Sequence, residues 1–393
     1  MVTKQVFAMS PKPSAIIIAG GYSSRMGELK ALLPMGGSTV LDQSINLFRS
    51  CGVNDIVVVT GHRAEKVRAA ADKAGVRTVY NPDFAQGMYS SIRAGVHELC
   101  ENSSGFFLLP VDIALVRRGT VNLLLQAQAQ APADIYYPVF EERRGHPPLL
   151  SSRLRDLIGE SDEPEGGLRT ILAALEADHP EQIREVQVAD ANIHFDMDTP
   201  DDYFEGCIRF ARKGVPTMAE AKAIIDHIYC MPEKGLAHGR MVGDVAGILC
   251  QTVIRHSGRE LNPQTCRVCG LLHDIAKGHP HHEQTGATWL RELGFEEAAE
   301  IVGAHKDMDW SPEMGVGERE LVHLADKVVR GSRMVRVNER FEEKLALYKH
   351  DPEAVEAILG RYRLAQNLAA AVEAEVGQPL ELIMEMASAS CSH

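Results

Sequence analysis

A change of hydrophobic pattern close to residue 213 constrains the fold of this 393-residue chain more than any other feature of its sequence. Before that point, short apolar runs rich in β-branched and aromatic residues alternate with amphipathic stretches. The runs lie at 15–19, 55–60, 77–80, 106–109 and 134–139, and the stretches at 41–51, 64–74 and 120–129. This alternation predicts an α/β domain of Rossmann-like type, in which helices cover a mostly parallel sheet.

Beyond residue 213 the apolar residues recur at three- and four-residue spacing, which predicts an all-α second domain. The predicted helices include 218–228, 241–256, 264–276 and 354–376. We therefore expect five segments along the chain. They are a flexible N-terminus at 1–13, the α/β domain at 14–212, a linker at 213–217, a helical domain at 218–335, and a helical C-terminal extension at 336–393 suited to packing or self-association.

Charge and composition exclude several classes of function. Lys and Arg total 41 and Asp and Glu total 54, a net charge of −13, so the chain lacks the basic excess needed to coat DNA or RNA. No apolar run approaches the ~20 residues of a membrane span, and residues 1–13 lack the apolar core of a secretory signal. Eight irregularly spaced cysteines fit reduced thiols. We expect a cytoplasmic protein with neither nucleic-acid nor membrane partners.

A glycine turn follows the first predicted strand, in the segment AGGYSSRMGELK at 19–30. Two glycines leave backbone amides free to approach an anion, and Arg25 and Lys30 add two cations, as a triphosphate requires. The spacing matches neither the dinucleotide-binding pattern GxGxxG nor the phosphate loop GxxxxGK[ST]. Taken alone, these residues also fit an ordinary strand-to-loop turn with exposed basic side chains.

The pattern AGGxSSRMGxxK resembles the signature of the molybdenum-cofactor nucleotidylyltransferases, which have the nucleotide-diphospho-sugar transferase type of fold. Further matching blocks are KALLP (30–34), TVLD (39–42), VTGHR (59–63), NPDFAQGM (81–88), GHP (145–147) and DMDTPDD (196–202). The resemblance covers about residues 14–212. It implies Mg2+-dependent transfer of a nucleotidyl group from CTP or GTP to molybdopterin or molybdenum cofactor, with release of pyrophosphate, and a molybdenum hydroxylase apoenzyme as a further partner.

The resemblance also implies roles for individual residues. Asp112, which follows the predicted strand 106–109, would bind the catalytic Mg2+ together with Asp198 and Asp196, and Arg25 and Lys30 would act catalytically by neutralising the triphosphate. Asp196 and Asp198 could instead cap the helix that begins near residue 200. The residues implied in nucleotide binding are Ala19, Gly20, Gly21, Ser23, Ser24, Arg25, Lys30, Gly87, Ser90 and Ser91, and those implied in acceptor binding are His146 and Arg169.

The choice between CTP and GTP rests on conflicting blocks. Ala19-Gly20-Gly21 is typical of the guanylyl branch, whereas the NPDFAQG, GHP and DMDTPDD blocks resemble the cytidylyl branch. The segment PVDIA at 110–114 departs from the family's usual Gly-Asp-x-Pro loop. On balance these blocks favour CTP. The alternative is a nucleotidyl transfer onto a phosphosugar or phosphoalcohol.

The helical half carries histidines and aspartates of the types that bind Mn, Fe, Mg or Zn. These residues are His238, His273, Asp274, His282, His305 and Asp326, with His281 as an alternative to His282. Lys277 follows His273 by four residues, so we expect it on the same helix face, within reach of a phosphate oxygen. The pair Cys266 and Cys269 has no second pair at zinc spacing and predicts buried helical cysteines. Three other histidines, His256, His279 and His323, are expected to be surface or packing residues.

The order of these residues around LLHDIAK at 271–277 resembles the HD phosphohydrolase superfamily, over about residues 230–335. The resemblance implies that His238, His273, Asp274 and Asp326 are the core metal ligands and that His282 and His305 bind a second metal. Lys277 would be a catalytic residue. The alternative is a non-catalytic nucleotide-sensing or partner-binding module, although the complete ligand set favours catalysis.

Overall fold

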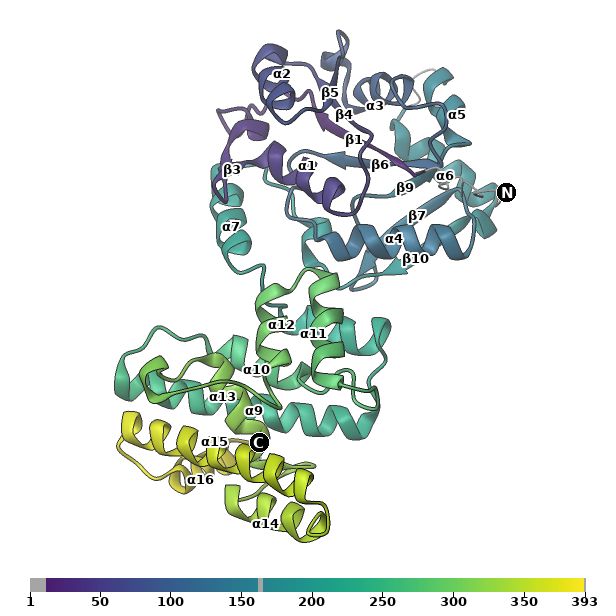
Figure 1. Cartoon of the computed structure of the whole chain (residues 1–393). Coiled ribbons are helices and arrows are strands. Elements are labelled where there is room, and N and C mark those ends of the chain that lie inside the picture. The colour runs from purple at the N-terminus through teal and green to yellow at the C-terminus, as the bar shows by residue number, and fades with distance from the viewer. Residues whose placement is uncertain (1–11, 162–164, 392–393) are drawn as a thin grey trace, which may run out of the picture. The chain divides into compact units, whose positions relative to one another are not determined.

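The computed structural model describes residues 12–161 and 165–391, with side chains up to residue 385, and the chain divides after Arg212 into two compact units (Figure 1). Most of the segment 1–13 expected to be flexible lies outside the described residues. Among those described, no helix is long and apolar enough to cross a membrane.

The first unit is built on an eight-stranded sheet in the order β10-β7-β9-β6-β1-β4-β5, with β8 paired to β7. The strands are β1 (Ser14–Ala19), β4 (Ile56–Thr60), β5 (Arg77–Tyr80), β6 (Gly105–Pro110), β7 (Ile135–Phe140), β8 (Arg143–Arg144), β9 (Leu149–Ser151) and β10 (Ile183–Gln187). Pairs β1–β4, β1–β6, β4–β5 and β7–β10 are parallel, whereas β9 runs antiparallel to β6 and β7. The prediction of a mostly parallel sheet is confirmed.

Helices and a short hairpin surround this sheet. The helices are α1 (Val40–Ser50), α2 (Ala64–Lys73), α3 (Met88–His97), α4 (Arg118–Gln130), α5 (Leu154–Glu160), α6 (Leu168–Asp178) and α7 (Pro200–Ala211), and the hairpin pairs β2 (Pro34–Met35) with β3 (Ser38–Thr39). Alternate residues of the strands serve opposite faces. Ile16 packs in a core cluster with Ile92 of α3, while Phe107 of β6 meets Phe48 of α1 at a ring-centroid distance of 5.4 Å.

Parallel pairing brings the loops after β1 and β6 to one edge of the sheet. The amide of Val111 donates to the carbonyl of Ile18 at 3.0 Å, so the glycine turn and Asp112 are neighbours. The amide of Met197 donates to the carbonyl of Asp112 at 3.1 Å and adds the segment 196–198 to the same edge. Ligands of open α/β sheets collect at this carboxyl edge.

The second unit is mostly helical, as predicted (Figure 1). It contains α8 (Met218–Ala223), a π-helical turn (Ile224–Ile228), α9 (Glu233–Ser257), α10 (Pro263–Leu272), α11 (His282–Leu293), α12 (Glu296–Gly303), α13 (Glu318–Lys327), α14 (Val337–Leu347), α15 (Pro352–Val376) and α16 (Leu380–Cys391). A small hairpin of β11 (Val329–Arg330) and β12 (Arg333–Met334) follows α13 and was not predicted.

Glycines let α9 and α10 approach closely. A Cβ placed on Gly270 would lie 2.6 Å from the Cα of Gly243, and one on Gly239 would lie 2.4 Å from the carbonyl oxygen of Leu271. Any larger side chain there would force the helices apart. This close crossing places His238 of α9 beside His273, which directly follows α10; their ring centroids are 5.1 Å apart.

The prediction that one helix runs from 264 to 276 is wrong, because α10 ends at Leu272. The chain then turns, with the amides of Ile275 and Lys277 bonded to carbonyls three residues back, at 3.0 and 2.8 Å. Lys277 therefore does not share a helix face with His273, contrary to expectation. Its Nζ instead donates to Asp274 Oδ2 at 2.9 Å.

Candidate active sites

Two carboxylates and a lysine form the centre of the first site. Lys30 Nζ lies 2.8 Å from Asp112 Oδ2 and 2.5 Å from Asp198 Oδ1, and its side chain is only 12% exposed. Burial acts to lower the pKa of Lys30, but the hydrogen bonds and charges of the two aspartates outweigh it and raise that pKa. Because both carboxylates already converge on one cation, these residues fit a divalent ion with oxygen ligands such as Mg2+.

Asp198 is held from two sides. Arg25 Nη1 donates to Asp198 Oδ2 at 2.9 Å, and the hydrogen bond from Lys30 lowers the pKa of Asp198. The N-cap of α7 is Thr199, whose hydroxyl accepts the amide of Asp202. Helix capping therefore does not occupy Asp198, which leaves its carboxylate at the site. Asp196 is exposed beside this group.

The glycine turn is tied back on itself. The carbonyl of Ser23 accepts the amides of Met26 and Gly27, both at 3.1 Å, and the Ser23 hydroxyl accepts the amide of Lys30 at 3.3 Å. Ser23 adopts a positive φ of 52°, which sets the sharp turn. Gly21 and Ser24 are exposed, whereas Ala19 and Gly20 are buried at the end of β1.

Ser90 and Ser91 lie in α3, but their hydroxyls are used within the protein. Asn81 Nδ2 donates to both hydroxyl oxygens at 2.9 Å, and the Ser90 hydroxyl donates to the carbonyls of Asp83 and Gly87. This buried network favours a structural role for the two hydroxyls over direct contact with a nucleotide. Gly87 is exposed at the start of α3 with a φ of 120°.

An aromatic group at the same edge was not predicted. The Tyr22 ring lies 5.2 Å from the ring of His62 and 5.3 Å from that of Phe84, measured between centroids, and Tyr22 is 53% exposed. These side chains come from the loops after β1, β4 and β5. The sequence signal was available: each of these loops carries one aromatic or imidazole ring within a matching block.

His146 and Arg169, the two predicted acceptor residues, line one cavity of about 910 Å3. Other side chains around it include Met88, Tyr137 and Arg144. Burial lowers the pKa of His146, and its Nδ1 is buried without a hydrogen-bond partner. His146 is therefore a neutral ring with one nitrogen free to bind a polar group.

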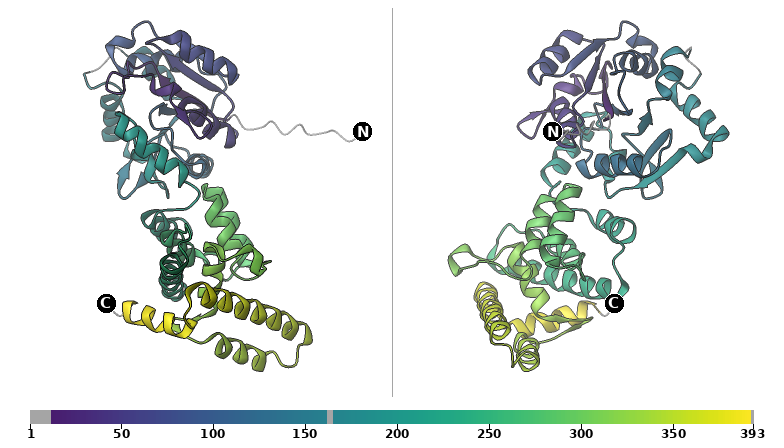
Figure 2. Two further views of the ribbon diagram at one scale, coloured as in Figure 1. Left: turned by 90° about the vertical axis from the view of Figure 1, so that its left-hand side faces the viewer. Right: turned by 45° about the vertical axis from the view of Figure 1, so that its right-hand side comes forward.

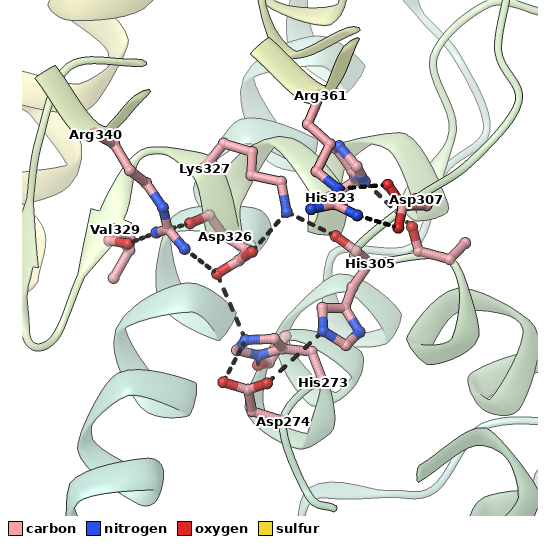
Figure 3. Close-up of polar contacts among 12 residues, drawn as sticks. His273, Asp274, His305, Asp307, His323, Asp326, Lys327, Val329, Arg340 and Arg361 are labelled. Carbon is pink, nitrogen blue, oxygen red and sulfur yellow. Dashed lines mark hydrogen bonds and ion pairs between the residues drawn. The ribbon is translucent and has the colours of Figure 1, made fainter. Parts of the chain in front are cut away.

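The second site brings six predicted residues together in the second unit. Figure 3 shows four of them, His273, Asp274, His305 and Asp326. Two groups have ligand atoms within 4.8 Å of one another: His238 with His273 and Asp274, and Asp274 with His282 and His305. Asp274 belongs to both. Its Oδ2 lies 3.6 Å from His273 Nε2, and its Oδ1 lies 3.2 Å from His282 Nε2 and 3.7 Å from His305 Nε2. One carboxylate can thus serve two metal ions.

Three of the four histidines of this site are hydrogen-bonded through Nδ1 to backbone carbonyls, and His282 makes only a longer contact through Nδ1. The contacts are His238 to the Gly331 carbonyl at 3.0 Å, His273 to the Gly270 carbonyl at 2.7 Å, His305 to the Val302 carbonyl at 2.6 Å, and His282 to Glu283 Oε2 at 3.4 Å. A carbonyl at Nδ1 fixes the proton on that nitrogen, so the lone pair lies on Nε2 and points into the site. This arrangement is the usual support of metal-binding histidines.

Burial and charge suit a metal. Burial lowers the pKa of His273 and lowers the pKa of His305 to about 3, so both rings are neutral and able to bind a cation. His273 Nε2 is also buried with no hydrogen-bond partner. A buried nitrogen without a partner is costly unless an ion or water binds it. The donor set of imidazoles and carboxylates fits a transition metal.

Asp326 lies beside the first group. Its Oδ1 is 3.3 Å from His238 Nε2 and 3.7 Å from His273 Nε2.

His282 rather than His281 faces Asp274, since His281 is exposed at the start of α11. His256 and His279 are exposed and His323 is buried, as expected for surface and packing residues; Cys266 and Cys269 are buried within α10. All seven cysteines with described side chains are free.

Comparison with known proteins agrees with both resemblances. Residues 15–180 match the family model described as the MobA-like NTP transferase domain, and residues 235–331 match the HD domain. The chain is 29% identical to the molybdenum cofactor cytidylyltransferase of Escherichia coli (strain K12), over 50% of this chain and 95% of that protein.

Two further relatives carry different names. The nicotine blue oxidoreductase of Paenarthrobacter nicotinovorans is 28% identical over 41% of this chain and 82% of its own length. The molybdenum cofactor guanylyltransferase of Xanthomonas euvesicatoria pv. vesicatoria is 33% identical over 33% of this chain and 60% of its own length. The similarity therefore extends to proteins whose names state different activities.

Proposed function

We propose that this chain, which joins a MobA-like NTP transferase domain to an HD domain, transfers a cytidylyl group to molybdenum cofactor and also hydrolyses a phosphate ester or pyrophosphate bond. The first activity belongs to the unit before Arg212 and the second to the unit after it. The observation that carries the first proposal is the convergence of Asp112, Asp198 and Lys30 beside the glycine turn.

The nucleotidyl transfer needs little covalent chemistry from the protein. A terminal phosphate oxygen of the acceptor attacks the α-phosphorus, and the bond to the pyrophosphate oxygen breaks. Magnesium bound by Asp112 and Asp198 with the triphosphate would supply charge that stabilises the leaving pyrophosphate. Lys30 and Arg25, released from these carboxylates by the incoming cation, would then contact phosphate oxygens. Positioning and electrostatics account for the rate.

The aromatic group of Tyr22, His62 and Phe84 supports binding of a base at this edge, because an exposed ring can stack on a nucleobase. The cytidylyl-like blocks favour CTP over GTP. The match to 95% of the Escherichia coli protein, which is a cytidylyltransferase by name, also favours CTP. The cavity lined by His146 and Arg169 would hold the acceptor. Arg169 would pair with its phosphate, and His146 would orient it through Nδ1.

The decisive experiment for this half incubates the purified chain with Mg2+, molybdenum cofactor and each of CTP, GTP and ATP, and identifies the dinucleotide by mass spectrometry. We expect the cytosine dinucleotide and one pyrophosphate per product. A product formed only with a phosphosugar or phosphoalcohol would favour the alternative acceptor. A guanine dinucleotide would reverse the assignment of the nucleotide.

The proposal for the second unit rests on the Nε2 atoms that converge around Asp274. Divalent metal ions held by His238, His273, Asp274, His282, His305 and Asp326 would supply Lewis acidity and an activated water. Water oxygen attacks phosphorus, and the ester or pyrophosphate oxygen leaves with a proton. Lys277, 60% exposed and bonded to Asp274, is placed to bind a phosphate oxygen at the mouth of the site.

The test compares wild type with a His273→Ala, Asp274→Ala double variant, with His256→Ala as a control on an exposed histidine. Metal content is measured by elemental analysis, and phosphatase and pyrophosphatase activities are measured on a nucleotide panel. We expect the double variant alone to lose metal and hydrolysis. Wild-type protein that holds metal but hydrolyses nothing would favour the sensing module.

A further inference from the structure

We propose that the helical extension at 336–393 completes the metal centre of the HD domain by supplying two positioning residues, Arg340 and Arg361. The inference rests on the metal site proposed above and concerns which parts of the chain build it. The match to the HD domain ends at residue 331, before either arginine. Arg340 lies in α14 and Arg361 in α15, which form a hairpin of helices (Figure 2).

Arg340 is hydrogen-bonded to the C-terminal end of α13, where Asp326 lies. Its Nη2 is 3.1 Å from Asp326 Oδ1, and its Nη1 donates to the backbone carbonyls of Asp326 and Val329 (Figure 3). The last carbonyls of a helix lack partners within it and carry its negative end, so a guanidinium there is favourable. One side chain thus fixes both the backbone and the carboxylate of a ligand residue.

The other oxygen of the Asp326 carboxylate is fixed as well. Lys327 Nζ lies 2.8 Å from Asp326 Oδ2 and donates to the carbonyl of His305 at 2.9 Å. With one oxygen on Lys327 and the other on Arg340, the carboxylate has one orientation, and that orientation faces His238. Hydrogen bonds to ligating carboxylates are part of the support that tunes metal affinity.

Arg361 acts on the opposite side of the site. Its Nε and Nη2 donate to the two carboxylate oxygens of Asp307 at 2.6 and 2.8 Å, a bidentate pair. Asp307 follows His305 by two residues, in a segment outside the helices. Arg361 therefore anchors the loop that carries His305 (Figure 3). Arg340 thus supports the ligand group of His238 and His273, and Arg361 supports the ligand group of His282 and His305.

Burial distinguishes this role from direct contact with substrate. The Arg340 side chain is 14% exposed, and its guanidinium is shared among three oxygen acceptors of the protein. To bind a phosphate it would have to leave Asp326 and uncap α13. Positioning is thus the role that the contacts favour.

The test titrates the metal-free full chain with Mn2+ alone, by calorimetry and by electron paramagnetic resonance. We expect wild type to bind about two Mn2+ ions, one for each ligand group. Arg340→Gln should weaken the site of His238 and His273 by about 10- to 100-fold. Arg361→Gln should instead weaken the site of His282 and His305. Arg340→Lys keeps the positive charge but loses the planar, forked guanidinium. Its Mn2+ affinity should lie between those of wild type and Arg340→Gln.

Arg333→Gln is the matched control, since Arg333 is exposed on β12 and only approaches Glu339, at 3.7 Å. It should bind Mn2+ as wild type does. The inference is overturned if Arg340→Gln keeps wild-type affinity at both sites, or if it raises KM for a phosphate ester while Mn2+ affinity is unchanged. If Arg340→Gln fails to fold, Arg340→Lys decides by the same titration. Wild-type protein that binds no Mn2+ refutes the metal centre itself, and that outcome is distinct from the others.

Discussion

The two sites of this chain organise charge in different ways. In the first, Asp112 and Asp198 lie at the carboxyl ends of the strands, and Lys30 contacts both carboxylates. Arg25, which contacts Asp198, has a side chain that is 74% exposed. In the second, the side chains of His273 and His305 are 1% and 3% exposed, and both rings are hydrogen-bonded at Nδ1 to backbone carbonyls. Both sites pair carboxylates with lysines, but Lys30 bridges the two carboxylates of the first site, whereas in the second Lys277 and Lys327 each contact one carboxylate.

This difference in charge predicts that metal ions bind to the two sites in different ways. At the first, a metal must displace Lys30, and a triphosphate gives the released lysine a new partner. We therefore expect the metal and the nucleotide to bind to the first site together. At the second, burial lowers the pKa of His273 and of His305, and both rings lie beside Asp274, so we expect a metal to bind there without a nucleotide.

The largest expected effect is at the shared ligand Asp274. We expect Asp274→Asn to lose metal from both groups and to reduce hydrolysis below detection, because the substitution removes the only carboxylate common to the two groups. Nucleotidyl transfer should be unchanged. Elemental analysis and both activity assays check this, and full retention of metal would refute the shared-ligand arrangement.

The corresponding variant at the first site is Asp112→Ala. We expect nucleotidyl transfer to fall by about 10²- to 10³-fold, a typical loss when a group that stabilises transition-state charge is removed, here the metal that Asp112 would bind. The fold should persist, since Asp112 lies at the edge of the sheet and Lys30 keeps Asp198 as a partner. Metal content of the HD unit should stay at the wild-type level. Normal pyrophosphate release by this variant would remove Asp112 from the metal site.

Acid should destabilise the metal-free HD unit through its neutral histidines. Burial lowers the pKa of His305 and of His323 to about 3, below the ordinary value of 6.5. The folded state then binds fewer protons than the unfolded state, so this stability is complete above pH 6.5 and is lost as pH falls toward 3. Between pH 6.5 and pH 5 the loss is about 2 kcal/mol per histidine.

Urea unfolding of the metal-free protein, followed by tryptophan fluorescence, measures this loss. Trp289 and Trp310 are the chain's two tryptophans and both lie in the second unit, so they report on it alone. His323→Asn should make the pH dependence shallower, whereas His256→Asn, at an exposed position, should not. An unfolding free energy independent of pH over this range would contradict the burial argument.

The smallest expected effect concerns the nucleotide. A Cβ on Gly20 would lie 3.3 Å from Ser91 Oγ and 3.4 Å from the amide nitrogen of Gly61, so Gly20→Ala narrows the turn. We expect the ratio of kcat/KM for CTP over GTP to rise about tenfold, the lower range for one methyl group. Gly21→Ala is the control, since its Cβ would meet nothing within 4 Å. An unchanged ratio would exclude Gly20 from selectivity.

The sequence predicts the buried elements well and the marginal ones poorly. Strands such as β1 and β4 are fully buried runs of β-branched residues, so their pattern is plain. The strand β9 has three residues and runs antiparallel, and β10 is only partly buried, so neither has a clear periodic signal. The helix predicted through residue 276 was wrong because its apolar spacing continues into the turn after Leu272.

For the sites, the candidate ligands could be predicted from residue type and spacing, whereas the groups that support them could not. His238, His273, Asp274, His282, His305 and Asp326 were predicted, and the structure brings them together. The acceptors at Nδ1 are mostly backbone carbonyls, such as those of Gly270 and Val302, which leave no trace in residue type. Arg340 lies 14 residues beyond Asp326 in another helix, so only the fold reveals their contact.

The most direct test of the contrast between the two sites is a Mn2+ titration of the metal-free protein with and without CTP, followed by electron paramagnetic resonance. Our account predicts that the HD unit fills first, without nucleotide, and that CTP recruits one further ion. Asp112→Ala should abolish only that further ion, and Asp274→Asn only the ions bound without CTP. Contradiction would come from an ion that depends on Asp112 but binds without CTP, or from an HD unit that stays empty until CTP is added.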